Sequence, residues 1–316
     1  MPGPGILNTT AALSTAYACN TRVLAITGQI PSTSINKGFG MLHEIPEQLE
    51  VMKGLTKHSA RINHPTEAPQ KISEAFRQLR SGRPRPVGLE MPMDIMWKKS
   101  EVTLGSRTSG CPAPLPDPDL VEKAAKILGE SQQPMIFVGG GAYEACQEIK
   151  TLAETLQAPV ISYQNGRGIL DERHYLAHTN TAGAILWKNC DAAISIGCRM
   201  QAERMSWGMD DALKIIHVDI DPTEINRIMK PDVGLVSDAA FTTRKIIDAL
   251  NKYNLKRTSR EAEMLNLKAQ AEKLMEEKAG PQMAWLRAIR DVLPDNGLFV
   301  DEFTQVGYVS RVGFPV

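Results

Sequence analysis

The stretch Met135-Ile-Phe-Val138-Gly139-Gly140-Gly141 decides how the middle of this chain folds. Four apolar residues followed by glycines are typical of a buried parallel strand that ends in a tight turn. Similar short apolar runs recur at residues 160–163, 191–196, 214–219 and 233–236. Helical patterns at 142–156 and 239–250 separate them. Such alternation predicts an α/β fold in which a doubly wound parallel sheet is covered by helices on both faces.

A proline-rich segment precedes this central domain. Residues 101–118 contain four prolines without apolar periodicity, which is the composition of an extended linker. Asp117 as N-cap and Pro118 at the first helical position then predict the opening helix. We expect a Rossmann-like, nucleotide-binding-like domain over residues 119–253.

The chain on the N-terminal side shows a second α/β pattern. Residues 1–100 begin with a Gly-rich turn at Gly3, where a complete unit would begin with a strand. Apolar runs predict strands at 22–28, 58–62 and 85–91, and helical patterns occupy 8–18, 47–54 and 66–79. We therefore expect an incomplete α/β domain here.

The last part of the chain predicts the start of a third α/β domain. Residues 254–282 are strongly charged and typical of a connecting helix, within which 255–278 carries most of the charge. Residues 283–316 continue with an amphipathic helix to Leu293, a Pro-Asp-Asn-Gly turn and a strand that starts over Leu298–Asp301. The 316 residues are thus expected to be a piece: one incomplete domain, one complete domain and the beginning of a third.

Composition excludes several classes of protein. Lys plus Arg and Asp plus Glu number 36 each, so the chain lacks the basic excess of a nucleic-acid or anionic-membrane binder. No apolar run reaches the about 18 residues of a membrane helix, and the N-terminus is unlike a signal peptide. We expect a soluble, cytoplasmic protein. The five cysteines contain no C-x-x-C pair, so neither a disulfide framework nor a zinc site is predicted.

Several predicted strands of the central domain end in residues suited to a nucleotide. They are Gly139, Gly140 and Gly141, then Arg199, Asp219 and Asp238. Ligands of open α/β sheets bind outside the carboxyl ends of strands, where glycines admit phosphates and a carboxylate can bind ribose. Glu144 replaces the third glycine of G-x-G-x-x-G, and Asp219 is far beyond the expected spacing, which argues against an NAD site. Tight turns without a ligand explain the glycines equally well.

His43 lies in the predicted loop Leu42-His-Glu-Ile-Pro-Glu47. Pro46 and the lack of a second histidine four residues on exclude a zinc-protease helix. An imidazole in a loop can act as an acid, a base or a polar substrate contact. It can equally be a surface histidine without such a role.

Ordered motifs in the first domain resemble the pyrimidine-binding domain of thiamine-diphosphate-dependent enzymes. They are Gly3-Pro-Gly-Ile-Leu-Asn8, Val23-Leu-Ala-Ile-Thr-Gly28-Gln29, Leu42-His-Glu-Ile-Pro46, Leu55-Thr-Lys-His58 and Ser81-Gly-Arg-Pro84. Residues 134–141, 191–199 and 217–222 resemble the family's central domain. Within the family, the chain is most similar to the large subunit of acetolactate synthase, with benzaldehyde lyase and benzoylformate decarboxylase as further relatives.

The resemblance implies a transferase or lyase activity. Such enzymes use thiamine diphosphate and Mg²⁺ for carboligation or decarboxylation of 2-keto acids or related carbonyl compounds, and they assemble as homo-oligomers, here a dimer or tetramer. The implied cofactor contacts are Pro4, Asn8, Gly28 and Gln29, with Gln305 at a turn that meets the diphosphate in relatives. His43 falls where acetolactate synthases usually carry glutamine near the reacting carbon, so we expect it to be the catalytic residue of an acetolactate-synthase-like enzyme.

The family's central domain holds FAD, ADP or nothing. Gly139 to Gly141, Arg199, Asp219 and Asp238 match positions that contact the nucleotide in flavin-binding members. Leu176-Ala-His-Thr179 stands where the family carries Gly-Met-His-Gly, and the loss of both glycines argues against FAD. FAD and ADP both remain open.

Two features of the family are missing from this sequence. The pyrimidine-contacting glutamate lies upstream of the Gly-Pro-Gly turn in relatives, and no Gly-Asp-Gly segment for Mg²⁺ occurs, so no metal ligand is assigned. We expect the isolated chain to be catalytically inactive. The alternatives are a non-catalytic nucleotide-binding module and an inactive partner subunit.

Overall fold

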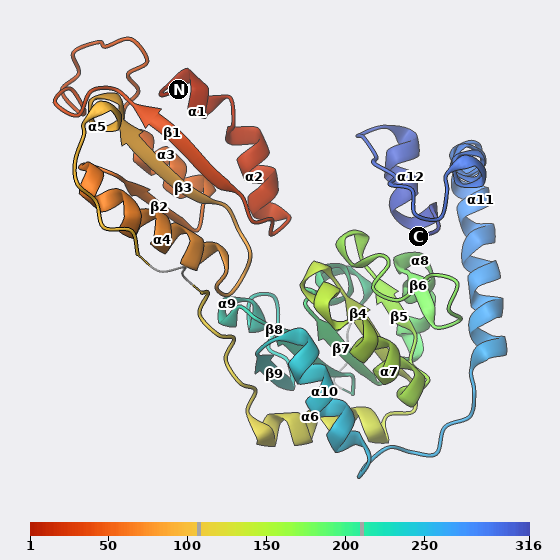
Figure 1. Cartoon of the computed structure of the whole chain (residues 1–316). Coiled ribbons are helices and arrows are strands. Elements are labelled where there is room, and N and C mark those ends of the chain that lie inside the picture. Colours follow the sequence, from red (N-terminus) through yellow and green to blue (C-terminus); the bar gives the residue numbers. More distant parts are fainter. Residues whose placement is uncertain (106–108, 209–211) are drawn as a thin grey trace. The chain divides into compact units, whose positions relative to one another are not determined.

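The computed structural model describes residues 1–105, 109–208 and 212–316. The chain folds as two compact units, Met1–Ala113 and Pro114–Val316 (Figure 1). Each unit is built on a parallel sheet covered by helices. The fold is therefore α/β, as the alternation of strands and helices predicts.

The first unit contains a parallel sheet whose described strands run in the order β1-β3-β2. The strands are β1 (Leu24–Gln29), β2 (His58–Arg61) and β3 (Val87–Pro92). The helices are α1 (Pro4–Leu7), α2 (Thr10–Ala18), α3 (Gln48–Leu55), α4 (Ala68–Leu79) and α5 (Met93–Trp97), with a 3-10 turn at Pro65–Glu67. The Gly-rich opening, predicted as a turn, leads directly into the short helix α1.

Alternation along β1 divides the core of this unit into two layers. Leu24 packs with Leu79 of α4 and Leu89 of β3. Its neighbour Ala25 packs on the opposite face, with Met52 of α3 and the residues of α1 and α2. This is the period of two expected of a strand, whose successive side chains point to opposite faces of the sheet. Ile26 returns to the α4 side but is 70% exposed, because α4 contacts β3 and β2.

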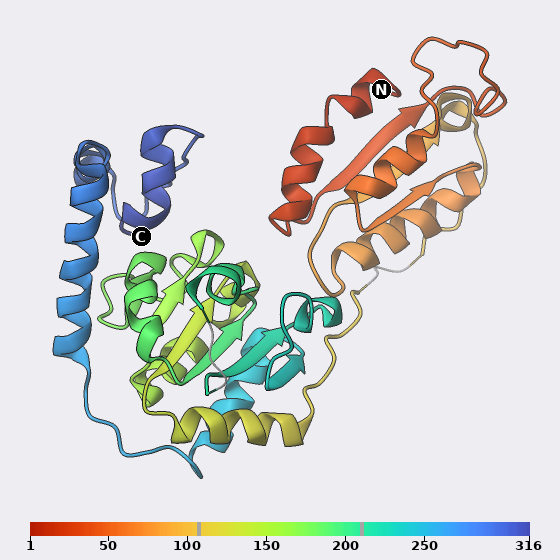
Figure 2. The same cartoon turned by 180° about the vertical axis from the view of Figure 1, so that it is seen from behind.

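The second unit contains a parallel sheet whose described strands run in the order β6-β5-β4-β7-β8-β9 (Figures 1 and 2). They are β4 (Pro134–Val138), β5 (Val160–Ser162), β6 (Ala177–Thr179), β7 (Ala192–Ile196), β8 (Lys214–Asp219) and β9 (Val233–Val236). The α-helices are α6 (Pro118–Glu130), α7 (Cys146–Leu156), α8 (Asn180–Leu186), α9 (Pro222–Ile225), α10 (Ala239–Leu250), α11 (Glu261–Val292) and α12 (Gln305–Gly313). Three 3-10 turns at Gly140–Ala145, Gln164–Gly166 and Trp187–Asn189 and a π-helix at Glu203–Trp207 complete the described elements.

Strand β4 shows why this sheet is buried on both faces. Ile136 and Val138 pack against α6, α7 and α10. Met135 and Phe137 pack on the other face, where the Phe137 and Trp187 rings meet edge to face at 5.7 Å. Successive strands are added on one side from β4 to β6 and on the other from β7 to β9. The direction therefore reverses between β4 and β7, which is the switch point at which such sheets bind ligands.

The secondary structure differs from the prediction in three places. Leu298–Asp301 forms no strand, because no described strand pairs with it, and a strand needs a hydrogen-bonded partner. Strand β6 and helix α8 were not predicted, since their short sequences show no clear period. The charged helix begins at Glu261, six residues beyond Leu255, and runs on to Val292 past a break at Ala279 that Pro281 imposes.

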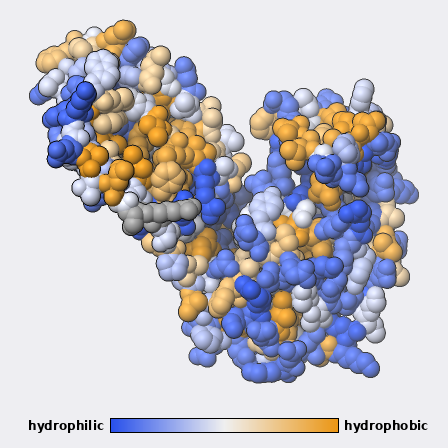
Figure 3. Space-filling model, viewed as in Figure 1, coloured by the Kyte–Doolittle hydropathy of each residue, from blue (hydrophilic) through white to orange (hydrophobic). Residues whose placement is uncertain are grey.

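Apolar side chains gather around α12 and the end of α11 in the space-filling view (Figure 3). Leu298, Val300 and Phe303 are large apolar residues that are exposed in this region. The stretch predicted as a strand thus contributes exposed apolar surface to the unit.

Two histidines are buried in the second unit, His178 in β6 and His217 in β8. Burial lowers the pKa of His178 to about 3, assisted by the nearby Lys268. Burial and the nearby Arg204 lower the pKa of His217 to about 4. Both side chains are therefore neutral in the folded protein at neutral pH, because a buried imidazolium would lose its hydration.

We predict that the second unit loses stability as the pH falls below 6.5, the ordinary histidine value. The unfolded chain then takes up protons that the folded chain excludes, so each histidine lowers the free energy of unfolding by up to about 1.4 kcal/mol per pH unit. Urea unfolding between pH 7 and pH 4.5 measures this slope. His217→Gln should make it shallower, and an unchanged slope would contradict the assignment.

Candidate functional site

The Gly3 turn, the end of β1 and the His43 loop converge in the first unit. Gly3 has a φ of 53°, and a Cβ atom placed on it would lie 2.3 Å from the His43 carbonyl oxygen. Only glycine fits this combination of left-handed backbone and close approach. A Cβ atom on Gly28, in β1, would lie 3.4 Å from the Pro2 ring. Segments that are distant in the sequence therefore meet at one end of the sheet.

Gln48, the first residue of α3, joins these segments by hydrogen bonds. Its Oε1 accepts from the Gly3 backbone N–H at 2.8 Å. Its Nε2 donates to the Gly28 carbonyl oxygen at 2.9 Å and to Oε2 of Glu90 at 2.9 Å. The side chain is 1% exposed, so each of these bonds replaces hydration that the buried groups have lost.

Glu90 extends this network into the sheet. Its carboxylate lies in β3, is 0% exposed, and pairs with the guanidinium of Arg61 in β2. A buried carboxylate needs such a partner because its desolvation is costly. Arg61, Glu90 and Gln48 thus form a continuous polar path to the Gly3 turn.

The predicted cofactor residues of the first unit lie around this network. Pro4 begins α1, and Asn8 caps its C-terminal end; both are exposed. Gln29 ends β1 and is almost fully buried, with its Oε1 accepting from the backbone N–H of Ile30 at 2.8 Å. The Asn8 amide is therefore exposed at the surface, whereas the Gln29 amide is buried at the end of β1.

His43 lies in a loop with unusual backbone geometry. Its φ is 70°, and Glu47, four residues later, has a φ of 49°. Both lie in the left-handed region, which costs free energy for residues other than glycine and is found most often at functional sites. The imidazole is half-buried and makes no hydrogen bond within the described part of the chain. It is therefore free to contact a ligand.

A cavity of about 560 Å³ opens beside this loop. It extends from Gln29 at the end of β1 to Glu47 before α3. Glu44 fixes the backbone that forms one wall of the cavity, since its carboxylate accepts hydrogen bonds from the N–H groups of Gly38 and Met41 at 3.2 and 2.8 Å. The cavity thus begins next to Gly28 and the Gln48 network.

In the second unit, the predicted nucleotide residues lie at the carboxyl ends of the adjacent strands β4, β7, β8 and β9. The glycines there pack against one another: a Cβ atom on Gly139 would lie 2.6 Å from the Gly197 carbonyl oxygen. The Gly139 N–H donates to Ile196 at 3.4 Å, and the Gly141 N–H donates to Gly197 at 3.2 Å. The backbone N–H groups of Gly139 and Gly141, which were predicted to bind a nucleotide, are therefore already bonded within the protein. Gly140 lies exposed between them.

The charged residues at this edge are also engaged by the protein. Arg199 donates from Nε to Glu224 at 3.0 Å, although 38% of its side chain is exposed. Asp219 accepts from the backbone N–H of Asp221 at 2.9 Å. Asp238 caps α10 by accepting from the Phe241 N–H at 2.8 Å. Arg199 is thus a partly exposed basic group at this edge, paired with Glu224.

The last predicted cofactor residue, Gln305, is the first residue of α12. Thr304 caps this helix by accepting from the Gly307 N–H at 3.0 Å, so the predicted turn is a helix start. The Oε1 of Gln305 accepts from Gln282 of α11 at 3.0 Å.

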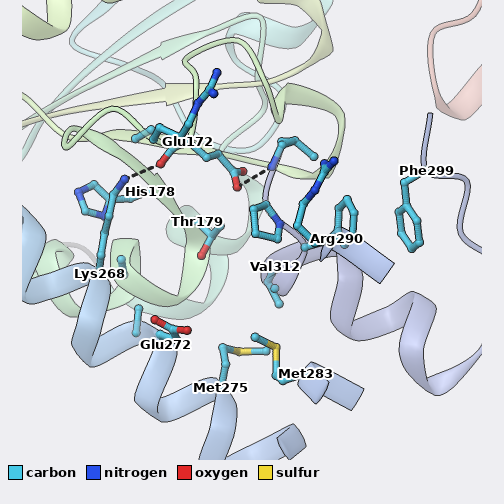
Figure 4. Close-up of a pocket in the computed structure, with 18 of the residues that line it drawn as sticks. Glu172, His178, Thr179, Lys268, Glu272, Met275, Met283, Arg290, Phe299 and Val312 are labelled. Atoms are coloured by element: carbon cyan, nitrogen blue, oxygen red, sulfur yellow. Dashed lines mark hydrogen bonds between the residues drawn. The ribbon is translucent and has the colours of Figure 1, made fainter. Parts of the chain in front are cut away.

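A second cavity, of about 740 Å³, lies between β6, α11 and α12 (Figure 4). Lys268 crosses one side of it and donates to the carbonyl oxygens of Glu172 and His174 at 2.6 and 2.7 Å. His178 and Thr179, from the stretch compared with Gly-Met-His-Gly, line this cavity. The structure thus separates these two residues from the glycine turns at β4 and β7.

Comparison with known proteins identifies the family. The family model for the thiamine pyrophosphate enzyme central domain matches residues 121–250. A probable acetolactate synthase large subunit from Methanocaldococcus jannaschii is 33% identical over 273 residues, which is 80% of this chain and 45% of the relative. The chain belongs to the thiamine pyrophosphate enzyme family. The central domain of this family matches the six-stranded unit described above.

Other relatives support the same family. Acetolactate synthase from Arthrospira platensis is 33% identical over 254 residues, covering 75% of this chain and 43% of that protein. A probable 2-ketoarginine decarboxylase from Pseudomonas aeruginosa is 28% identical over 329 aligned positions, covering 99% of this chain and 57% of that protein. The chain spans about half the length of these relatives.

Two further features are absent from the described residues. No helix in residues 1–105, 109–208 or 212–316 is both long and apolar enough to cross a membrane. The same residues contain no cluster of three or more His, Cys, Asp or Glu side chains that could hold a metal ion.

Gln48, Glu90 and Arg61 were not predicted as site residues. Glu90 could have been found, because a carboxylate inside the apolar run Val87–Met91 requires a buried partner. Gln48 gives no such signal, since a glutamine at a helix start is ordinarily exposed. Its role depends on contacts with Gly3 and Gly28, which are 45 and 20 residues away in the sequence.

We predict that Gln48→Leu lowers the free energy of unfolding of the first unit by about 1–3 kcal/mol, because it leaves the buried Gly3 N–H without an acceptor and removes one of the two side chains that bond the Glu90 carboxylate. Urea unfolding measures the loss. Gln70→Leu, at an exposed position of α4, is the matched control and should change stability little. Equal effects of the two substitutions would show that the network does not stabilise the unit.

Proposed function

We propose that this chain provides the pyrimidine-binding side and the central domain of a thiamine-diphosphate-dependent decarboxylase or carboligase that acts on 2-keto acids. The convergence of the Gly3 turn, Gly28 and the His43 loop on Gln48 carries this proposal. The relatives named acetolactate synthase and 2-ketoarginine decarboxylase support the substrate class.

The residues of the first unit fit the thiamine pyrimidine. The Gly3-Pro4 turn is held rigidly by Gln48, and the exposed Asn8 amide can donate to and accept from ring nitrogen and amine groups. Gln29 offers a second amide from the end of β1. We assign no residue to Mg²⁺, because the described residues include no suitable cluster. Gln305 is proposed as a diphosphate contact.

When bound, thiamine diphosphate would supply a carbon nucleophile for the substrate carbonyl and an electron sink for the bonding pair that stays behind when CO₂ leaves. The protein's part is to orient the reactants and to move protons. His43 is proposed to exchange a proton with the reacting oxygen or carbon, since its imidazole is free of other hydrogen bonds within the described residues. The close packing of the His43 backbone on Gly3 would fix where that imidazole lies.

Calorimetric titration tests the cofactor proposal. Thiamine diphosphate with Mg²⁺ should bind the chain, and Asn8→Ala should weaken binding about five- to tenfold through the loss of a hydrogen bond. Asn63→Ala changes another exposed asparagine of the first unit and should leave affinity unchanged. Absence of binding by the unsubstituted chain would refute the proposal.

His43→Ala tests the catalytic assignment. In the active holoenzyme we predict that turnover falls by about 100-fold or more, as expected when a proton-transfer group is removed, while thiamine diphosphate affinity stays within about twofold. His43→Asn is the companion variant, because asparagine tolerates the left-handed φ of this position. Unchanged turnover in both variants would remove His43 from the mechanism.

We also propose FAD or ADP as the group that the central domain takes. Arg199 at the switch point supports this, whereas the bonded amides of Gly139 and Gly141 favour tight turns without a ligand. Calorimetric titration of the chain with FAD and with ADP decides between a nucleotide site and tight turns without a ligand. Nucleotide binding without thiamine chemistry would support the alternative of a binding module, and thiamine chemistry only with a second chain would support a partner subunit.

The proposal extends to assembly and location. Homo-oligomerisation as a dimer or tetramer follows from the family assignment and is testable by light scattering. A cytoplasmic location is proposed on the same basis.

A further inference from the structure

A cationic residue precedes each described strand of the sheet in the first unit. Arg22 lies two residues before β1, Arg85 two residues before β3 and Lys57 one residue before β2. The first residues of β1 and β2 are both paired with Val87, the first residue of β3, so the three strands begin side by side. The sheet therefore gathers Arg22, Lys57 and Arg85 at the end where the arrows of its strands begin in Figure 1. We call this end the cationic edge.

No carboxylate accompanies these cations. The segments that approach the cationic edge, residues 17–24, 55–60 and 78–89, contain neither aspartate nor glutamate. None of the three cations forms an ion pair within the part of the chain that the structure describes. The described residues therefore leave the positive charge of this edge unbalanced.

Backbone carbonyl groups occupy only part of the donor capacity. Lys57 donates from Nζ to the carbonyl oxygens of Ser81 and Arg83 at 2.8 and 2.9 Å. Arg22 donates from Nε to the carbonyl oxygen of Leu79 at 3.0 Å. These carbonyl groups lie at and just beyond the C-terminal end of α4, where the helix dipole is equivalent to about half a negative charge. Half a charge leaves most of the charge of three cations without compensation.

Arg85 keeps a donor without an acceptor. Its Nη1 donates to the hydroxyl group of Tyr17 at 2.9 Å, and its guanidinium carbon lies 4.1 Å from the centre of the Tyr17 ring. Its Nε is buried and has no hydrogen-bond partner among the described residues. The two terminal nitrogens of Arg22 make no hydrogen bond with the described residues either. Since buried donors normally have a partner, Arg85 points to an acceptor that comes from outside these residues.

Lys57 shows how strongly the cations act on one another. Burial, followed by the neighbouring Arg22 and Arg85, lowers the pKa of Lys57 from the ordinary lysine value of 10.5 to about 8. Like charges at this range raise the free energy of the protonated amine. An anion placed among the three side chains would act in the opposite direction. The cationic edge thus favours a ligand with several negative charges.

We propose that the cationic edge is a binding site for an oligophosphate, such as a pyrophosphate group. Three cations can balance the about three negative charges of pyrophosphate near neutral pH, whereas a carboxylate would balance one of them. Arginine binds phosphate oxygens through two parallel N–H donors, and lysine adds a point charge. The site lies at the opposite end of the sheet from Gly28 at the end of β1, so it is separate from the proposed thiamine site. It does not depend on the proposed function.

Calorimetric titration of the full chain with inorganic pyrophosphate, at low salt and without Mg²⁺, tests the site. We expect pyrophosphate to bind at least tenfold more tightly than acetate. Arg22→Gln should weaken pyrophosphate binding about five- to tenfold, because it removes charge-assisted donors. Lys98→Gln removes an exposed cation that follows α5 and is the matched control, which should leave the affinity unchanged. Equal effects of the two substitutions would contradict the proposal.

The side chain of Lys57 provides a local readout. NMR titration of the chain with ¹³C-labelled lysine should show that saturating pyrophosphate raises the pKa of Lys57, since an anion favours the ammonium form. Arg22→Gln should also raise this pKa without pyrophosphate, because it removes a neighbouring positive charge. A Lys57 pKa that pyrophosphate leaves unchanged would place the anion elsewhere and overturn the site.

Two further probes identify what carries the phosphates. Tighter binding of ADP than of pyrophosphate, with the same shift at Lys57, would assign the site to a nucleotide. Binding of ADP no tighter than that of pyrophosphate would assign it to the phosphate chain itself. Tighter binding of hexaglutamate than of pyrophosphate would overturn the proposal in favour of an acidic protein segment. Circular dichroism should show that both variants fold.

Discussion

The hydrogen bonds of Gln48 are the interaction on which the first unit's candidate site depends. One buried amide satisfies the Gly3 N–H, the Gly28 carbonyl and the Glu90 carboxylate. No water is needed to compensate these groups, and each segment is placed relative to the others by a short, directional contact. The His43 loop packs on the Gly3 turn thus held. Pre-organisation of this kind lets a protein bind a rigid ring without losing further conformational entropy in its own loops.

The carboxyl edge of the second sheet is organised differently. There the close packing of Gly139, Gly141 and Gly197 brings the turns after β4 and β7 together at the switch point. Glycines that suit a phosphate and glycines that let two turns touch have the same sequence signature, because both need room beside the backbone. Turn packing and phosphate binding therefore predict the same glycines at this edge, and the partly exposed Arg199 is a basic group there that can contact an anion.

Much of the fold could be predicted from the sequence because strand burial and helix periodicity are local. The run Met135–Val138, the cap at Asp117 and the helix after Pro118 all follow from neighbouring residues, and the structure has β4 and α6 there. The strand predicted over Leu298–Asp301 does not form, because an apolar run becomes a strand only beside another strand. Within the candidate site, the motif residues Gly3, Gly28 and His43 were predictable, but Gln48 was not, because its contacts join residues distant along the chain.

The exposure of Ile26 is a second consequence of the strand order β1-β3-β2. β1 lies at the edge of its described sheet, with one side hydrogen-bonded to β3 and with the Ile26 side chain 70% exposed. The other side of an edge strand presents backbone N–H and C=O groups beside an apolar side chain, which is a template for a further extended segment. A segment that paired with β1 would therefore extend the sheet and cover Ile26 at the same time.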